Sequence, residues 1–177
     1  MASYYYFAST LPLLRPDGPL PYGVDDFLKR AAELVGAKDM KILNAAAQRQ
    51  PQRNTFLNKW QEYQQMLRAE LASQRSRRPL YKGEEVVRKE VAEYAIVEAV
   101  RAALECDDPL QAELMLLNLQ WKILDELVGL QVFSIEALLA HLLKLQLLQR
   151  RSHFVQEKGN DEFSRIFTDL QGEIAKR

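Results

Sequence analysis

The residues of this chain that could perform covalent or proton-transfer chemistry are few and lie far apart in the sequence. Cys106 stands alone in "LECDDP", and the histidines are His141 and His153. Acidic neighbours disfavour the thiolate that a nucleophilic cysteine needs, so we interpret Cys106 as structural. A single cysteine also excludes an intrachain disulfide and a cysteine-rich zinc site, which is typical of a protein of a reducing, cytoplasmic compartment.

The remaining candidates for acid–base chemistry have simpler structural explanations. The carboxylate pairs Asp107–Asp108 and Asp125–Glu126 suit helix caps and exposed helix surfaces. His141 lies among leucines, which indicates a histidine that lines the core or a polar seam. The motifs Gly-x-Ser-x-Gly, His-Glu-x-x-His and Gly-Lys-Thr do not occur in the sequence. The sequence therefore predicts no catalytic residue, cofactor or metal site, and it does not favour an enzyme.

A basic run, "RSRRPLYK", occupies residues 75–82. Its cations suit phosphate groups of nucleic acid or lipid, but two glutamates follow at once and the net charge of the chain is zero. This balance disfavours a nucleic-acid partner. A solvated helix end or a protein interface suits the run better, because the guanidinium group pairs readily with carboxylates. We select Arg75, Arg77 and Arg78 as interface candidates; with Lys82 they also define an alternative function, the binding of phosphates or an anionic surface.

The start of the sequence, "MASYYYFASTLP", places three tyrosine rings and a phenylalanine where chain ends usually fray. The stretch is too short and too poor in aliphatic residues to anchor the chain in a membrane, and Pro12 interrupts it. We expect most of it to pack on the protein's own helices, in particular those of residues 109–150. At least one hydroxyl should stay exposed or hydrogen-bonded. Tyr4, Tyr5 and Tyr6 are therefore further interface candidates.

Apolar residues at three- and four-residue spacing predict an all-α, multi-helix bundle in a single domain that covers residues 1–177. A docking segment and a Pro-rich connector form residues 1–23, and the helical body forms residues 24–177. Asp25 and Asn54 are expected to cap two of the helices, and Gly36 and Pro79 to end two of them. The expected helices are about 25–36, 39–48, 54–78, 83–107, 109–128, 135–154 and 161–175.

The central element should be an antiparallel helical hairpin at about 109–150. Asp108 suits a cap, Pro109 suits the first helical position and Gly129 lies past the end of the first helix. Ser134 should cap the second helix after a short connector, and two long helices joined in this way pack antiparallel.

Three finer predictions concern individual side chains. Glu113 and Asn118 are polar positions on the first hairpin helix and should lie near packed surface. Arg150 is the last interface candidate, although a helix-end ion pair with a carboxylate such as Glu113 explains it better. The helix from Gly83 should bury Val87, Val91, Tyr94, Ala95, Val97, Val100 and Leu104.

The charges are unevenly distributed along the chain, although they cancel overall. Residues 1–89 contain 15 Lys/Arg and 9 Asp/Glu, and residues 90–177 contain 9 and 15, so the two halves carry +6 and −6. The simpler interpretation is that the two halves face each other or that their charges are solvated. The alternative is that the halves form two binding faces of opposite sign. No window of about 18 uncharged apolar residues predicts a membrane span.

Several blocks, in this order, resemble an uncharacterised bacterial family of small helical proteins encoded within gene clusters for V/A-type rotary ATPases. The resemblance covers nearly the whole chain. Its most specific parts are the tyrosine start that ends in Leu-Pro and the run from Leu143 to Arg150, followed by Gly159. The blocks are "YYYFASTLPLL", "DDFLKRAAEL", "TFLNKWQEYQQMLRAELASQRSRR", "DPLQAELMLLNLQWKILDEL" and "FSIEALLAHLLKLQLLQRRSHFVQEKGNDEFSRI".

The resemblance implies a role in coupling rather than catalysis. Those clusters commonly lack a recognisable adaptor of the C/d type, the all-helical component that seats the central rotor shaft on the membrane proteolipid ring. The block from Phe133 to Arg150 also resembles helical segments of that adaptor, although this chain is much shorter. The implied partners are the rotor shaft and the proteolipid ring. The protein would then be cytoplasmic and would associate with the inner membrane only through these partners. An assembly or regulatory factor of the same ATPase is the alternative.

Overall fold

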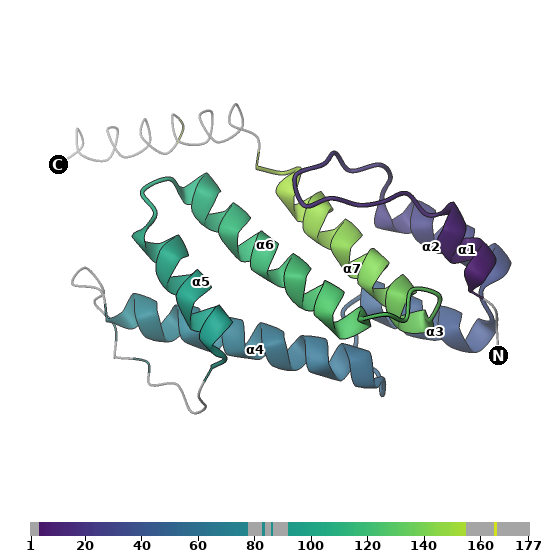
Figure 1. Cartoon of the computed structure of the whole chain (residues 1–177), viewed down its shortest axis with the longest axis horizontal. Helices are drawn as coiled ribbons and strands as arrows, with labels where there is room; N and C mark the ends of the chain where they lie inside the picture. Colours follow the sequence, from purple (N-terminus) through teal and green to yellow (C-terminus); the bar gives the residue numbers. More distant parts are fainter. Residues whose placement is uncertain (1–3, 78–82, 84–85, 87–91, 155–164, 166–177) are drawn as a thin grey trace.

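The structure is a computed structural model that describes residues 4–77, 83, 86, 92–154 and 165. The described residues form helices and no strand, which confirms the all-α prediction. The expected last helix at 161–175 lies outside the described residues except for Arg165. The helices are α1 Tyr5–Thr10, α2 Val24–Leu34, α3 Ala37–Ala47, α4 Thr55–Ser76, α5 Tyr94–Glu105, α6 Pro109–Val128 and α7 Ile135–Arg151 (Figure 1).

The predicted hairpin is confirmed as the centre of the molecule, where α6 and α7 lie side by side (Figure 1). The Asp108 carboxylate accepts a hydrogen bond from the Leu110 amide at 2.9 Å, and the Ser134 hydroxyl accepts one from the Ala137 amide at 3.3 Å. Gly129 follows α6 with a positive φ of 56°, a conformation that glycine adopts without steric cost. Local sequence signals therefore set both helix starts and the turn between them.

The hairpin separates two hydrophobic clusters, and α6 contributes side chains to both. The cluster on the α7 side joins α1, α2, α3 and the start of α4 to α7 and to one face of α6, and includes Phe27, Leu43 and Leu142, each with 0% exposure. The cluster on the α6 side joins α4 and α5 to α6, around Ile96 and Val100. Burying a leucine or isoleucine side chain contributes about 1.5–3 kcal/mol. The hairpin is thus the shared wall between two cores, and the two halves of the chain meet where α4 packs on α5 and α6 and where α2 and α3 pack on α7.

Residues 4–23 lie against this body by two kinds of contact. Phe7 is 2% exposed and packs against Phe27, with 5.6 Å between the ring centroids. Arg151, the last residue of α7, donates hydrogen bonds of 2.8–3.0 Å to the carbonyls of Pro16, Asp17 and Gly18. The Pro-rich connector therefore closes over the end of α7 through backbone groups that form no helix of their own.

Two expectations about helix starts are wrong. The cap of α2 is Gly23, whereas Asp25 and Asp26 lie in the first turn, where their charge favours the helix dipole. Helix α5 begins at Tyr94 rather than at Gly83, because Gly83, Val86 and residues 92–93 are not helical. Asn54, by contrast, is the cap of α4, as expected: its side chain accepts from the Leu57 amide at 3.0 Å.

The buried face of α5 also differs from the expected one. Ile96, Val100 and Ala103 are buried, while Tyr94 is 79% exposed and Ala95 is exposed. Val100 was expected correctly, and Val97 and Leu104 lie at the edge of the buried stripe. Val87 and Val91 lie outside the described residues. The short helix presents only one narrow stripe to α4 and α6, and that stripe is centred one residue away from the predicted one.

Candidate functional site

A patch of exposed apolar side chains covers the end of the molecule where α1 approaches the turn between α6 and α7. The rings of Tyr5 and Phe133 lie 4.7 Å apart, and Leu13 and Val132 line one surface hollow. Leu130 is 98% exposed directly after Gly129. We call this patch the apolar end. Its members are Tyr5, Tyr6, Leu13, Leu130, Val132 and Phe133.

The three consecutive tyrosines at 4–6 have different roles at the apolar end. The Tyr4 hydroxyl donates a hydrogen bond to the carboxylate of Asp39 on α3. Burial, and then the hydrogen bond and negative charge of Asp39, raise the pKa of Tyr4 to about 12. Tyr5 and Tyr6 are 60% and 66% exposed. Tyr4 therefore anchors α1, and the other two rings are left available to a partner.

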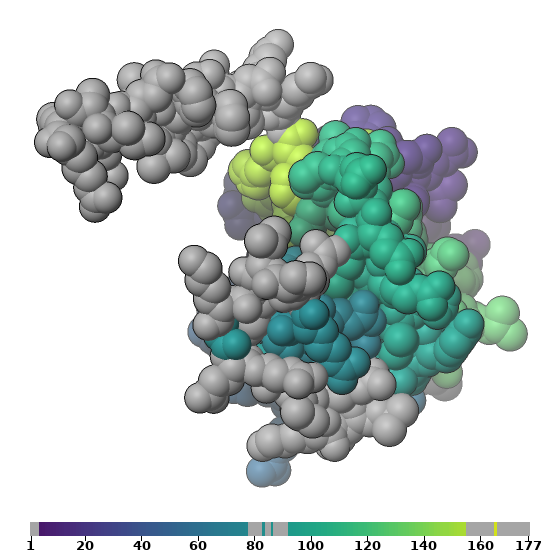
Figure 2. Space-filling view, turned by 90° about the vertical axis from the view of Figure 1, so that its left-hand side faces the viewer, coloured from purple at the N-terminus to yellow at the C-terminus, as the bar shows by residue number. Residues whose placement is uncertain are grey.

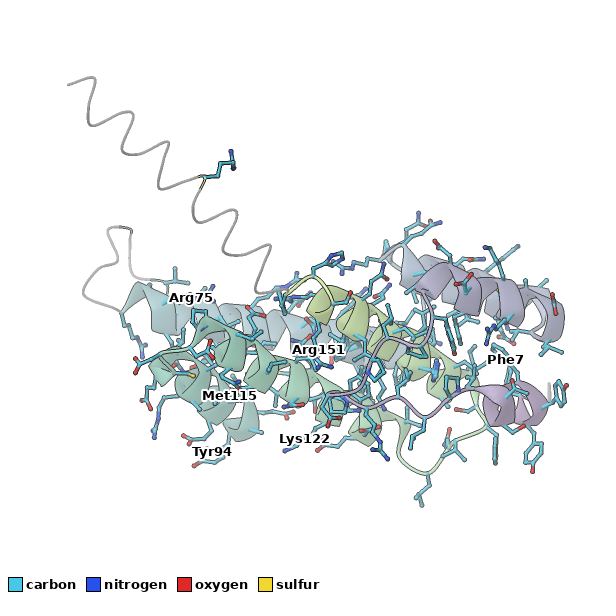
Figure 3. All side chains as sticks on the ribbon, turned by 90° about the horizontal axis from the view of Figure 1, so that it is seen from above. Phe7, Arg75, Tyr94, Met115, Lys122 and Arg151 are labelled. Atoms are coloured by element: carbon cyan, nitrogen blue, oxygen red, sulfur yellow. The ribbon has the colours of Figure 1, made fainter. Side chains whose placement is uncertain are left out.

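Two of the basic candidates lie together at the other end of the molecule. Arg75 is in the last turn of α4 and Arg77 caps it, and both are exposed. Cations at this position are favoured by the helix dipole. Arg78 and Lys82 lie outside the described residues. Figure 3 shows Phe7 and Arg75 at opposite ends of the long axis, and Figure 2 views the molecule from the end where α4, α5 and the start of α6 meet.

Arg150 belongs to neither end. Its guanidinium pairs with the Glu113 carboxylate at 2.7 Å, as the structural interpretation expected, and lies 5.9 Å from the ring centroid of Phe154. Asn118, expected near packed surface, is exposed. Sequence reasoning missed Arg151, whose backbone partners lie more than 130 residues away. No local pattern could have distinguished the two neighbouring arginines.

His141 lies in an aromatic cluster on the α7 side. Its Nε2 is 2.9 Å from the Tyr22 hydroxyl, and its ring stacks on Phe27 with 5.4 Å between centroids. Burial, and then the charge of Lys144, lower the pKa of His141 to about 4. The ring is therefore neutral near pH 7, and its contacts fit the expected polar seam of the core.

Other chemistry finds little support in the part of the chain that the structure describes. The Cys106 thiol donates to the Asp108 carbonyl at 3.4 Å. No group of three or more His, Cys, Asp or Glu residues among the described residues is arranged to hold a metal ion. Within the same residues, no helix combines the length and the apolar character that crossing a membrane requires.

Comparison with known proteins gives a family but no characterised relative. Neither the curated proteins nor the solved structures include a match to the chain. One family model matches residues 43–174, which cover α4 to α7 and leave out α1 and α2. Because the match extends over more than half of the sequence, the chain belongs to this family, which is described as a protein of unknown function (DUF2764).

Proposed function

We propose that this protein is a non-catalytic component of a bacterial V/A-type rotary ATPase, an adaptor of the C/d type that couples the central rotor shaft to the membrane ring. The proposal combines the sequence resemblance with one structural observation, the apolar end. Six large apolar side chains are exposed there, and Tyr5, Tyr6, Leu13, Leu130 and Val132 are each more than half exposed. Contiguous exposed apolar surface is typical of protein interfaces.

The helical body also suits an adaptor. The 22 residues of α4 span about 33 Å at 1.5 Å per residue, and Arg75 in its last turn lies far from the apolar end (Figure 3). A coupling element needs two separate docking surfaces on a stiff support. Torque transfer further requires interfaces larger than the roughly 1,200 Å² of transient contacts. The apolar end and the basic end of α4 are the two surfaces that we assign to this role.

Co-purification from native membranes tests the proposal. A tagged copy, expressed in cells that contain a V/A-type ATPase, should recover the shaft and ring proteins after mild solubilisation. Replacing Tyr5 and Tyr6 by serine should lower that recovery by about tenfold or more, because truncating interface aromatics can cost about 2 kcal/mol. Tyr94→Ser is the matched control, since Tyr94 is similarly exposed on α5, away from the apolar end.

The alternatives give different outcomes in the same preparation. Recovery of no ATPase component by the unaltered protein would overturn the proposal. An assembly or regulatory factor would be recovered below one copy per complex and would be missing from a cryo-EM map of the mature ATPase. Salt-sensitive binding to anionic vesicles, lost when Arg75 and Arg77 are replaced by glutamine, would instead support the phosphate-binding alternative.

A further inference from the structure

A polar cleft of about 430 Å³ lies between α4 and α7, beside the end of α3. Its apolar lining consists of buried side chains of the α7-side cluster, among them Leu57, Leu143 and Leu147. The lining residues of α4 run from Leu57 to Arg68, which corresponds to about 16 Å of helix. This length matches about five residues of extended polypeptide. The cleft belongs to neither end of the molecule.

The polar lining of the cleft has an unusual composition. Amides and guanidinium groups dominate it, and none of its lining residues is acidic. Glutamine offers both donors and an acceptor, as a peptide backbone requires, and arginine pairs with carboxylates. The half-buried ring of Trp60 adds an apolar surface. The polar side chains are Gln50, Gln61, Gln64, Gln65, Gln120 and Gln146, with Arg49, Arg68 and Arg150.

Part of this polar lining is already engaged within the protein. Gln146 donates to the Ala47 carbonyl at 3.0 Å, and Gln64 donates to Gln120 at 3.4 Å. Arg150 is paired with Glu113. Arg49 and Arg68 are exposed, and the structure gives neither of them an ion pair with another described residue. These two cations are therefore the ones available to an incoming anion.

Arg49 is held in a conformation that arginine rarely adopts. The Gln50 amide donates to Ala45 at 2.8 Å and the Arg49 amide to Ala46 at 3.2 Å, the paired bonds that close a helix end. Arg49 itself has a φ of 55°, where glycine is usual. A residue with a side chain meets steric strain there, because its Cβ crowds the following carbonyl oxygen. A strained backbone with its side chain in a cleft is a common property of binding sites.

We infer that this cleft binds an acidic, extended segment of a partner protein. The glutamine amides would pair with the backbone of the segment, and Arg49 and Arg68 with its carboxylates. The length of the cleft and its row of amides favour a peptide over a compact phosphate compound. The inference concerns a surface separate from the apolar end, and it stands whether or not the partner belongs to an ATPase.

The two tryptophans of the chain allow a direct test by NMR of the ¹⁵N-labelled indoles. The probe is a blocked seven-residue peptide of alternating glutamate and alanine, compared with peptides in which glutamine or lysine replaces glutamate. The glutamate peptide should shift the Trp60 signal and leave that of Trp121, which is 6% exposed, unchanged. Equal binding of the glutamine peptide, or a Trp60 shift with ATP but not with the glutamate peptide, would overturn the inference.

Matched variants separate binding from folding. Arg49→Gly and Arg68→Gln should each weaken binding of the glutamate peptide by about tenfold through loss of a charge-assisted hydrogen bond. Lys59→Gln removes the same charge from an exposed position of α4 outside the cleft and should bind normally. Arg49→Gly should also melt at the same or a higher temperature, because it relieves the strained backbone. Unchanged binding by both cleft variants would contradict the inference.

Discussion

The two sides of the central hairpin are held together by different means. On the α7 side, polar bonds join distant parts of the chain: Tyr4 to Asp39, Tyr22 to His141, and Arg151 to the connector. On the α6 side, described side chains that bond across α4, α5 and α6 include Gln64 and Gln74, at 3.4 and 3.5 Å, and Tyr63, which bonds to Glu93 just before α5. Apolar packing of α4 and α5 accounts for most of the contact there.

This difference follows from the segments that cover each side. Helices α4 and α5 each present an apolar stripe, and apolar packing does not require a particular hydrogen-bonding partner. The covering of α7 includes the connector before α2, whose backbone carbonyls need donors when they are covered. Arg151 supplies them. The comparison predicts that apolar truncation is costly on both sides, and that on the α7 side the loss of Arg151 is costly as well.

The largest expected effect comes from truncating a leucine on each side of the hairpin. Leu142→Ala on α7 and Leu116→Ala on α6 should each lower the free energy of unfolding by about 2–5 kcal/mol, because both side chains are buried and leave cavities. Urea denaturation measures the loss. Leu130→Ala, at a 98% exposed position, is the control and should change stability by less than about 0.5 kcal/mol. A negligible cost for Leu116→Ala would mean that the α6 side is no true core.

The next effect is a pH dependence specific to the α7 side. The pKa of His141 is lowered from 6.5 to about 4 in the folded protein, so the unfolded chain binds the extra proton between these values. Stability should therefore fall as the pH drops from 6.5 towards 4, by on the order of 3 kcal/mol. The charged and titratable neighbours are Lys144 and Tyr22, with Arg30 over the Tyr22 ring.

A variant without the titrating ring isolates this contribution from those of the carboxylates. His141→Gln retains a hydrogen-bonding group opposite Tyr22 and should show a smaller loss of stability over the same pH range. Urea denaturation at three pH values, one near neutral and two in the acidic range down to about 4, provides the comparison. Parallel pH profiles for the two proteins would show that burial of His141 does not contribute to acid sensitivity.

Two neighbouring arginines give a sharper contrast. Arg151→Ala removes three hydrogen bonds to connector carbonyls and should cost about 2 kcal/mol, since bonds from charged donors contribute roughly 1.5–3 kcal/mol. Arg150→Ala breaks an exposed ion pair and should cost less than about 1 kcal/mol. Thermal denaturation of both variants measures the difference. Equal costs would mean that the connector is held by its apolar contacts alone.

The sequence predicts features that depend on neighbouring residues and misses those that depend on distant ones. The caps Asn54, Asp108 and Ser134 are visible locally, and so is the hairpin between two of them. The start of α5 and its buried stripe are not visible locally, because they depend on packing against α4 and α6. The same holds for Arg151, whose partners are brought near it only by the fold.

The candidate surfaces likewise combine features that the local sequence reveals with features that only the fold reveals. The tyrosines and arginines were identifiable by type, but their separation into two ends required the fold. The apolar end also includes Leu130 and Phe133, which the turn after Gly129 exposes. The cleft was not predicted, because its lining combines α3, α4, α6 and α7. Its single local signal, an arginine at a helix end where glycine is usual, becomes visible only once the end of α3 is known.

The smallest expected effect distinguishes anchoring from exposure among the first tyrosines. Tyr4→Phe removes the hydroxyl that donates to Asp39 and should cost about 1 kcal/mol, the usual contribution of one hydrogen bond. Tyr6→Phe removes a hydroxyl from a ring that is 66% exposed and should leave stability unchanged within about 0.5 kcal/mol. Both variants keep their rings, so both should retain the binding that we assign to the apolar end unless α1 itself detaches. Thermal denaturation therefore measures the contribution of the Tyr4 anchor to stability, while co-purification measures the contribution of the exposed rings to partner binding. If Tyr4→Phe were as stable as the unaltered protein, apolar contacts such as those of Phe7 would hold α1 by themselves, and the polar bonding of the α7 side would not extend to the apolar end.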